Sequence, residues 1–583
     1  MPAKKIWRLL PADPEAAQRL AARLKISTVV AQLLLNRGIS DEASARQYLD
    51  GRLIDLHDPS LLSGMSQAVA RLVKAIEQRQ RICVFGDYDV DGISGTAILV
   101  RLLEILKANF EWRLPQRRHG YGISPDIVTE LAERGVRLLV TVDCGITAVE
   151  AIRAANQAGM DVIITDHHSP KAELPPATAL IHPNLPGQSY PFAGLSGAGV
   201  AFKLAWALCR HVSGGAGVPT RPDLREFLHD ALGLASLGLI ADVVPLQDEN
   251  RIFVKHGLKR LHERTPLGLR SLLQVMEKSS EQPLRAEFIA FHIAPRMNAA
   301  GRLDRPDCVL ELLTTQSVAE AQQLALQLDQ KNKDRRRIES EIIAAAREMI
   351  DEHGYDDAPA LVLGHPSWHF GVVGIVAGRL AEEYARPVLL AGDAAGLAAG
   401  SGRSVPGFAI HEALAHCADL LVSYGGHPAA AGFRIPWHQL DALRDRFTQY
   451  AAAHFPDGMP PPPVLHLDAE LPLLAINKKL LNDLDHLEPF GAANPKPCFL
   501  ATNLHVDSVR RIGENGRHLN FRVSQEGRGM RVIMWNQGQR LNELINARRC
   551  SLAFTPKINV YQGEERIELN ADDFQVGDEP QLA

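Results

Sequence analysis

Three short apolar runs in the first third of the chain are each followed directly by acidic or histidine residues. The runs are Ile82–Phe85, Leu138–Val142 and Val162–Thr165. Continuous runs of Val, Ile and Leu are typical of strands buried on both faces of a parallel sheet, in which helices connect one strand to the next. Sites in such open sheets lie beyond the carboxyl ends of the strands. We therefore expect the polar residues that follow the three runs to meet at one edge of a sheet.

These polar residues are of the kinds that bind hard divalent cations. They are Asp87-Tyr88-Asp89-Val90-Asp91-Gly92, Asp143-Cys144-Gly145 and Asp166-His167-His168. Several carboxylates in one crevice repel one another and partly protonate unless a cation neutralises them. Carboxylates with one or two imidazoles suit magnesium or manganese, and the absence of a CxxC pair argues against structural zinc. Because two such ions activate water and stabilise in-line phosphoryl displacement, the pattern predicts phosphoester hydrolysis.

Each cluster also has a simpler interpretation. The first is similar to a calcium loop, but no glutamate stands at the EF-hand position after Asp91-Gly92 and a strand precedes it. Asp143-Cys144-Gly145 alone is typical of a turn, and a histidine pair alone is more often surface or core than ligand. The metal hypothesis depends on the coincidence of all three clusters at one edge.

The rest of the hydrophobic pattern predicts a multidomain α/β protein. A helix without Gly or Pro links two α/β regions, and short alternating segments after the proline run Pro460–Pro463 favour a Greek-key barrel. The expected domains are a helical cap at 1–58, a doubly wound parallel-sheet domain at 59–316, a bridging helix at 317–353, a second α/β domain at 354–459, and a linker with a β-barrel at 460–583.

Two glycine-rich stretches have more than one interpretation. Gly194–Gly199 is similar to a dinucleotide loop, but no strand leads into it, so a tight helix start that permits close backbone approach is favoured. In Gly400–Ser404, backbone N–H groups, Ser401 and Arg403 are suited to hold a terminal phosphate, and an ordinary hairpin is the alternative. The basic run from Lys331 to Arg337 is either a solvated helix face or a guide for a nucleic-acid backbone.

Composition excludes little. The chain has 583 residues, a formal net charge of −5 and seven cysteines. An odd, scattered set of cysteines is typical of reduced thiols and a cytoplasmic location. No apolar stretch follows Lys4, Lys5 and Arg8, so neither a signal peptide nor a membrane span is expected. The negative charge does not indicate nucleic-acid binding, although basic patches can still lie elsewhere on the surface.

The order of the motifs resembles the DHH phosphoesterase superfamily, named for the triplet Asp166-His167-His168. The matching segments are Gly86–Gly92, Gly238–Leu246, Pro295–Leu303, His369–Arg379, Gly400–Ser404 and Gly425–Gly432. Within it, the chain resembles enzymes that degrade single-stranded DNA from the 5′ end to mononucleotides in recombination and repair. The resemblance implies a DHH domain, a DHH-associated domain, an OB-fold and two manganese or magnesium ions. It also implies a monomer whose partners are single-stranded DNA, single-strand-binding protein and a RecQ-type helicase.

The resemblance also implies roles for individual residues. Asp91 and Asp143 are the expected shared or strongest metal ligands, Asp166 orients an imidazole, and His168 contacts the scissile phosphate or acts as an acid. Arg117 is the best match to the basic residue that meets the 5′ phosphate in the family. Arg118 is the alternative, because segment 115–122 is one residue shorter than the family pattern. The expected metal ligands are Asp87, Asp89, Asp91, Asp143, His167 and Asp242; further substrate contacts are Arg296, Asn298, Arg302, Ser401, Arg403 and His427; candidate base-stacking residues are Phe521, Trp535 and Tyr561.

Two other functions remain open from the sequence. A DHH phosphoesterase that acts on short oligonucleotides or nucleotide bisphosphates shares the metal site but needs neither the C-terminal barrel nor the bridging helix. A non-catalytic scaffold of the replication fork keeps the fold and loses ligands, and the full acidic set disfavours it.

Overall fold

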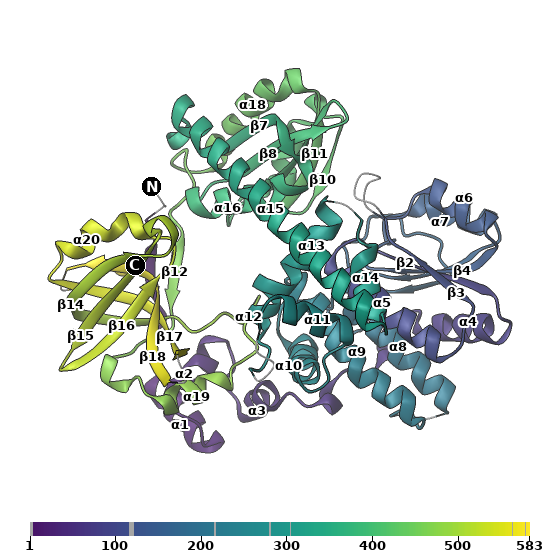
Figure 1. The fold of residues 1–583 in the computed structure, drawn as a ribbon, viewed down its shortest axis with the longest axis horizontal. Helices are drawn as coiled ribbons and strands as arrows, with labels where there is room; N and C mark the ends of the chain where they lie inside the picture. The colour runs from purple at the N-terminus through teal and green to yellow at the C-terminus, as the bar shows by residue number, and fades with distance from the viewer. Residues whose placement is uncertain are drawn as a thin grey trace. The chain divides into compact units, whose positions relative to one another are not determined.

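The computed structural model describes residues 4–115, 122–214, 217–278, 282–303, 305–561, 564–577 and 579–583, without the side chains of residues 560 and 561. Contacts divide the chain into two compact units. The first of the two comprises residues 43–334 and 488–495, and the other comprises residues 1–42, 335–487 and 496–583. We call them the catalytic unit and the accessory unit, and each is described by itself (Figure 1).

The catalytic unit contains the predicted parallel sheet. Its five strands lie in the order β3-β2-β4-β5-β6, and every neighbouring pair is parallel. The three apolar runs form its central strands, as expected. The bounds are β2 (Arg81–Gly86), β3 (Phe110–Arg113), β4 (Val136–Val142), β5 (Asp161–Thr165) and β6 (Ala179–Ile181).

Helices cover both faces of this sheet, which explains why its central strands β2, β4 and β5 consist largely of apolar residues. Ile82 and Val84 pack with α4 (Met65–Glu77), α5 (Val90–Ile105) and α8 (Gly197–Ser213) on one face. Cys83 and Phe85 pack with α6 (Pro125–Glu133) and α7 (Val149–Gln157) on the other. Figure 1 shows α6 and α7 on the opposite side of the sheet from α4 and α8. Each large side chain buried in this way contributes about 1.5–3 kcal/mol. The carboxyl edge of the sheet is thereby held rigidly.

The remaining elements of the catalytic unit are helical. They are α3 (Glu42–Asp50), α9 (Pro222–Ala241), α10 (Asp248–Glu263), α11 (Leu267–Val275), α12 (Ala286–Phe288), a π-helical turn (Ile289–Ile293), α13 (Ala294–Leu303) and α14 (Asp307–Thr314). The predicted bridging helix is α15 (Val318–His353), and the boundary between the two units falls within it.

The accessory unit contains a mixed sheet of order β10-β11-β9-β8-β7. Its strands are β7 (Leu361–His369), β8 (Val388–Ala394), β9 (Leu397–Arg403), β10 (Ser423–Gly426) and β11 (Ala430–Ile435). Its helices are α16 (Phe370–Tyr384), α17 (Ile410–His416) and α18 (Leu440–His454). Only β7 and β8 pair in parallel, so the sheet is not doubly wound.

A closed barrel forms the C-terminal part of this unit, as predicted. The order is β13-β14-β15-β16-β18-β17, and the pairing of β14 with β17 closes it. The bounds are β13 (Ala469–Glu470), β14 (Phe499–Ile512), β15 (His518–Gln525), β16 (Arg528–Met534), β17 (Arg549–Tyr561) and β18 (Glu564–Val576), with α19 (Lys478–Asp485) and α20 (Leu541–Ile545) beside them.

The beginning of the chain differs from the predicted helical cap. Strand β1 (Ile6–Leu9) precedes α1 (Pro14–Leu24) and α2 (Thr28–Asn36), and it pairs in parallel with β12 (Val464–Leu467). Trp7 is fully buried, and its indole N–H donates to Asp573 at 2.9 Å. A four-residue strand whose partner lies far along the chain leaves no local periodicity to detect. Among the described residues, no helix has the length and apolarity needed to cross a membrane.

Candidate metal centre

Acidic and histidine side chains gather at the carboxyl edge of the parallel sheet. Asp87 follows β2, Asp143 follows β4 and Asp166-His167-His168 follow β5. Asp242 joins them from the end of α9. Three groups in the described part of the chain bring their donor atoms within 4.8 Å of one another: Asp143 with His167 and His168, Asp91 with His167 and Asp242, and Asp87 with Asp89 and Asp143. Every predicted metal ligand belongs to one of these groups.

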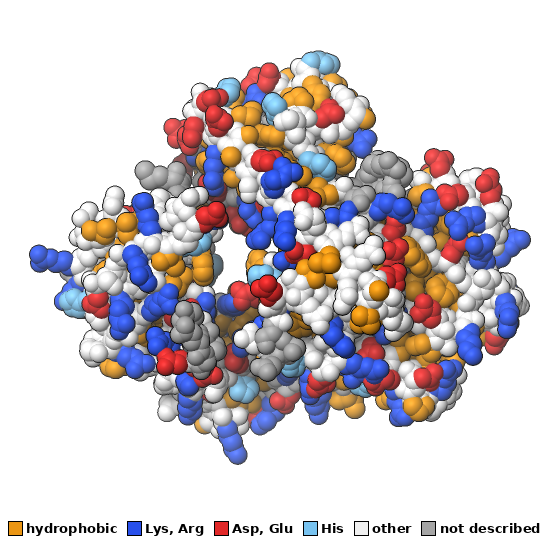
Figure 2. Space-filling view, viewed as in Figure 1, with side chains coloured by type: hydrophobic (Ala, Val, Ile, Leu, Met, Phe, Trp, Pro, Cys, Tyr) orange, Lys and Arg blue, Asp and Glu red, His pale blue; other side chains and the backbone are white. Residues whose placement is uncertain are grey.

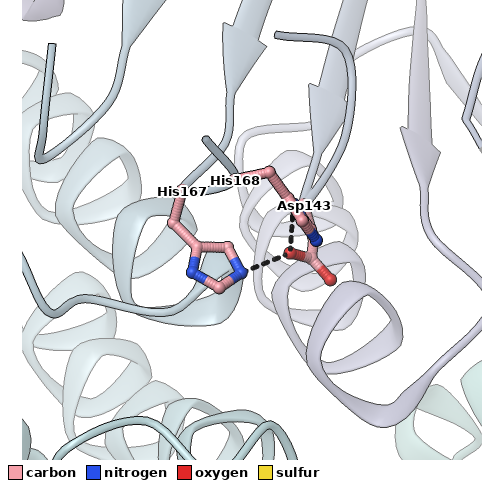
Figure 3. Close-up of side chains that lie close together, drawn as sticks. All are labelled: Asp143, His167 and His168. Carbon is pink, nitrogen blue, oxygen red and sulfur yellow. Dashed lines mark ion pairs between the residues drawn. The ribbon is translucent and has the colours of Figure 1, made fainter. Parts of the chain in front are cut away.

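His167 lies at the centre of the cluster. Its Nε2 atom is 3.1 Å from Asp143 Oδ1, 3.5 Å from Asp242 Oδ2 and 3.8 Å from Asp91 Oδ2. Figure 3 shows the imidazole of His167 turned toward the carboxylate of Asp143. The side chains of Asp91 and Asp143 are buried, whereas that of Asp242 is partly exposed. The cluster therefore has one open side.

The electrostatics of the cluster fit a bound cation. Burial and the charge of Asp89 raise the pKa of Asp91 to about 7, and burial with the charges of Asp91 and Asp89 raises the pKa of Asp242 to about 8. Burial and the same neighbouring carboxylates raise the pKa of Asp143 well above its ordinary value. These carboxylates resist ionisation together unless positive charge is supplied. Carboxylate and imidazole donors at this spacing suit magnesium or manganese.

Asp91 is held by the first turn of α8. Its Oδ1 accepts hydrogen bonds from Ser196 Oγ (2.7 Å) and Ala198 N (3.1 Å), and its Oδ2 accepts one from Gly197 N (2.7 Å). Because a helix N-terminus presents free N–H groups and positive charge, it favours the ionised carboxylate. Of roughly four acceptor positions on a carboxylate, three are used, and the remaining one lies on Oδ2.

Gly194–Gly199 is thus a helix start, as predicted, and its position explains the glycines. A Cβ atom at Gly197 would lie 2.4 Å from Asp143 Cβ. The close approach expected from the sequence is an approach to Asp143, a predicted metal ligand. The contact of Ser196 with Asp91 was not predicted, because serine before a helix is common and nothing in the local sequence identifies its partner.

Asp166 lies beneath the histidine pair and contacts His168. Its Oδ1 accepts from His168 Nδ1 (2.8 Å) and from the backbone N–H groups of His167 and His168, and its Oδ2 accepts from Ile146 N. Burial opposes charge on His168, but the hydrogen bond and charge of Asp166 outweigh it and raise the pKa of His168 to about 9. Burial likewise opposes charge on Asp166, but His168 and the backbone donors lower the pKa of Asp166.

The predicted phosphate contacts on α13 have protein partners. Arg296 Nε donates to Asp329 Oδ1 at 2.9 Å, and Asn298 Oδ1 accepts from Val90 N at 3.1 Å. Asn298 therefore holds the loop that carries Asp89 and Asp91. Arg302 is partly buried on the same helix.

Two predictions about the accessory unit need correction, and the first concerns the glycine-rich stretch Gly400–Ser404. Residues 400–403 lie within β9 and pair with both β8 and β11, so their backbone N–H groups belong to the sheet and do not form a nest. The side chains still meet, since Arg403 Nη1 donates to Ser401 Oγ at 2.8 Å. His427 is exposed in the turn between β10 and β11.

Phe521 is 1% exposed inside the barrel, so its prediction as a stacking surface is wrong. Alternation along β15 directs it inward. Trp535 is 51% exposed and meets the ring of His518 edge-on at 4.8 Å. Arg117, Arg118 and the side chain of Tyr561 lie outside the described residues.

Comparisons with known proteins agree with this architecture. Three family models match: the DHH family N-terminal domain at residues 81–234, the DHHA1 domain at 357–453 and the RecJ OB domain at 467–573. The chain is 36% identical over 577 residues to the single-stranded-DNA-specific exonuclease RecJ of Bacillus subtilis, covering 98% of this chain and 71% of that protein.

Solved structures give the same result. The chain is similar to RecJ of Thermus thermophilus in complex with Mn²⁺, with a TM-score of 0.83, 35% identity, and coverage of 98% of this chain and 80% of that one. The same protein in complex with Mg²⁺ gives a TM-score of 0.76 at 33% identity, with coverage of 98% and 79%. The fold and the acidic site define a metal-dependent DHH phosphoesterase. Within that class, the chain belongs to the RecJ family.

Proposed function

We propose that this protein is a single-strand-specific 5′→3′ DNA exonuclease that releases mononucleotides by phosphodiester hydrolysis with two divalent cations, manganese or magnesium. The observation that carries the proposal is the convergence of five aspartates and His167 at one sheet edge. RecJ relatives with the same domains are named as single-stranded-DNA-specific exonucleases, and one has been solved with Mn²⁺ and with Mg²⁺. A role in recombination and repair follows from this activity.

Two neighbouring groups would hold the cations. Asp91, His167 and Asp242 form one group, and Asp87, Asp89 and Asp143 form the other. Asp143 approaches both, because it also lies 3.1 Å from His167. Asp91 has one acceptor position left, so it offers a single ligand atom and Asp143 is the better candidate for a shared ligand. When bound, the cations supply positive charge for the phosphate and lower the pKa of water.

The protein's own residues prepare the phosphate site. The carboxylate of Asp166 fixes the proton of His168 on Nδ1 and keeps the imidazole cationic at neutral pH. A cationic imidazole beside the cluster suits contact with a phosphate oxygen or protonation of the leaving oxygen. Arg296, which donates to Asp329, is proposed to add a guanidinium to the same task, as the family resemblance implies.

The accessory unit carries features suited to a strand of nucleic acid. Figure 2 shows blue Lys and Arg side chains over the barrel strands. Arg522 and Arg531 are exposed and stand directly opposite each other on β15 and β16, and Arg531 lies 3.6 Å from Glu568. We propose that these arginines contact the strand backbone and that the exposed Trp535 stacks on a base, neither of which depends on base sequence. We propose that three residues in the mixed-sheet region of the accessory unit bind a substrate phosphate. They are Ser401, Arg403 and His427.

The alternative functions are less well supported. An enzyme restricted to short oligonucleotides or nucleotide bisphosphates does not require the barrel that the chain retains. A non-catalytic scaffold does not require a complete set of ligands.

The proposal is tested by a time course on long end-labelled single strands with and without a 5′ phosphate, in the presence of Mn²⁺. We expect mononucleotide release from the 5′ end, faster for the phosphorylated strand, and no release by the Asp143→Ala variant, which still binds the strand. Asp161→Ala is the control, because Asp161 is an exposed carboxylate at the opposite end of β5 and pairs with Arg71. Cleavage by metal-purified Asp143→Ala, or a preference for dinucleotides over long strands, overturns the proposal.

We also propose that the protein acts in the cytoplasm with single-strand-binding protein and a RecQ-type helicase. This extension rests on the family alone. Binding of the purified protein to each partner, measured with and without single-stranded DNA, tests it, and the absence of binding in both conditions refutes it.

A further inference from the structure

A buried asparagine connects the two chain segments that hold metal ligands from outside the sheet. Asn250 lies in the first turn of α10 and is fully buried. Its Nδ2 group donates to the carbonyl oxygen of Gly194 at 2.5 Å and to that of Pro245 at 3.0 Å. The two N–H donors of the amide thus bridge two segments that lie far apart in the sequence.

The first of these segments leads to Asp91. Gly194 stands two residues before Ser196, which caps the N-terminus of α8 and donates to Asp91 Oδ1. The next two residues donate their backbone N–H groups to the same carboxylate. A shift of the carbonyl of Gly194 therefore displaces the donors that fix Asp91.

The second segment carries Asp242. Pro245 stands three residues after Asp242, in the turn between α9 and α10. The intervening Val243 has φ +59°, which is unfavourable for a β-branched residue, and its side chain is 69% exposed. Because little packing holds Val243, the turn needs another restraint, and the bond from Asn250 to Pro245 provides one.

We propose that Asn250 is a positioning residue that sets Asp91 and Asp242 at the separation needed to bind one cation with His167. This inference rests on the metal ligands proposed above. Asn250 touches neither the cation nor the substrate and acts through the two carbonyl groups. Neighbours that orient ligands in this way typically change metal affinity by about 10–100-fold when they are removed.

The test is calorimetric titration of the full-length protein with Mn²⁺ alone, together with thermal unfolding without metal. We expect Asn250→Ala to weaken Mn²⁺ binding by about tenfold or more. Leu272→Ala is the matched control, because Leu272 is fully buried in α11 and its apolar side chain donates no hydrogen bond to Gly194 or Pro245. It should lower the unfolding temperature while leaving Mn²⁺ affinity unchanged. If Asn250→Ala does not fold, Asn250→Ser, which keeps one short donor, takes its place.

A double-mutant cycle with Ser196→Ala separates positioning from general destabilisation. Both changes act on the same carboxylate, so their effects on Mn²⁺ affinity should be less than additive. Equal Mn²⁺ affinity of the Asn250 variant and the wild type, or full additivity, overturns the inference. Failure of the wild type to bind Mn²⁺, or unchanged binding by Asp143→Ala, instead overturns the proposed metal site.

Discussion

The most direct test of the site's geometry is the addition of one methyl group at Gly197. A Cβ atom there would lie 2.4 Å from Asp143 Cβ and 2.5 Å from Asp143 Oδ1. Carbon atoms in contact normally stay about 3.5–4.0 Å apart, so Asp143 or the start of α8 must move by about 1 Å. Misplacement of that size in an active site costs on the order of 10²-fold in rate. We expect Gly197→Ala to lose activity to this extent.

Gly199→Ala provides the control within the same helix turn. Its Cβ atom would lie nearest to Leu195, with Cδ2 at 3.2 Å and Cβ at 3.6 Å. Both substitutions replace a helical glycine with alanine, which by itself is favourable by up to about 1 kcal/mol. The two variants therefore have the same backbone effect and differ in what the new methyl group meets.

The assay is hydrolysis of a 5′-phosphorylated single strand at saturating Mn²⁺, with unfolding temperature and Mn²⁺ affinity measured beside it. Gly199→Ala should remain close to the wild type in all three measurements. Gly197→Ala should lose rate and Mn²⁺ affinity while it stays folded. If Gly197→Ala cleaves as fast as Gly199→Ala, the packing of α8 against Asp143 does not set the geometry of the centre.

Three further predictions follow from the structure. First, the pKa values of Asp91 and Asp242 are raised to about 7 and about 8, so the folded metal-free protein binds more protons than the unfolded chain. Its stability should therefore fall as pH rises from about 4 to about 8. An unfolding temperature that rises over this range contradicts this account, and so does an unfolding temperature at pH 8 that Mn²⁺ does not increase. Second, Asp166→Asn removes the charge that holds the pKa of His168 at about 9, so NMR of the metal-free protein should show His168 losing its proton at lower pH, and an unchanged midpoint refutes the assigned role. Third, Trp535→Ala should weaken binding of a long single strand by about 1–3 kcal/mol and leave dinucleotide hydrolysis unchanged; equal loss on both substrates removes the barrel from strand binding.

The catalytic sheet could be predicted because its signal is local. Strands buried on both faces need apolar residues at every position, so Ile82–Phe85 and Val162–Thr165 stand out without knowledge of their partners. Parallel pairing then places all carboxyl ends at one edge, which brings Asp143 to His167. The bridging helix could be predicted equally well, because residues 317–353 include neither glycine nor proline.

The features that could not be predicted depend on partners distant in sequence. Trp7 pairs with Asp573 and places a strand at the start of the chain, where local composition favours helix. The glycines of Gly400–Ser404 suggested free N–H groups, but pairing on both sides of β9 uses them. Phe521 could not be distinguished from Trp535, because the direction of a side chain in a barrel depends on register that local sequence does not fix.

The first turn of α8 favours cation binding at the site through its contacts with Asp91. Burial and neighbouring charge act against ionisation of Asp91, Asp143 and Asp242 alike. The backbone N–H groups at the start of α8 donate hydrogen bonds to Asp91 that lower its pKa and offset part of the cost of burial. The helix start therefore favours the charged form of Asp91, which is the form that binds a cation. A bound cation would in turn favour the charged forms of Asp143 and Asp242, so the start of α8 contributes to cation affinity through Asp91 without touching the cation.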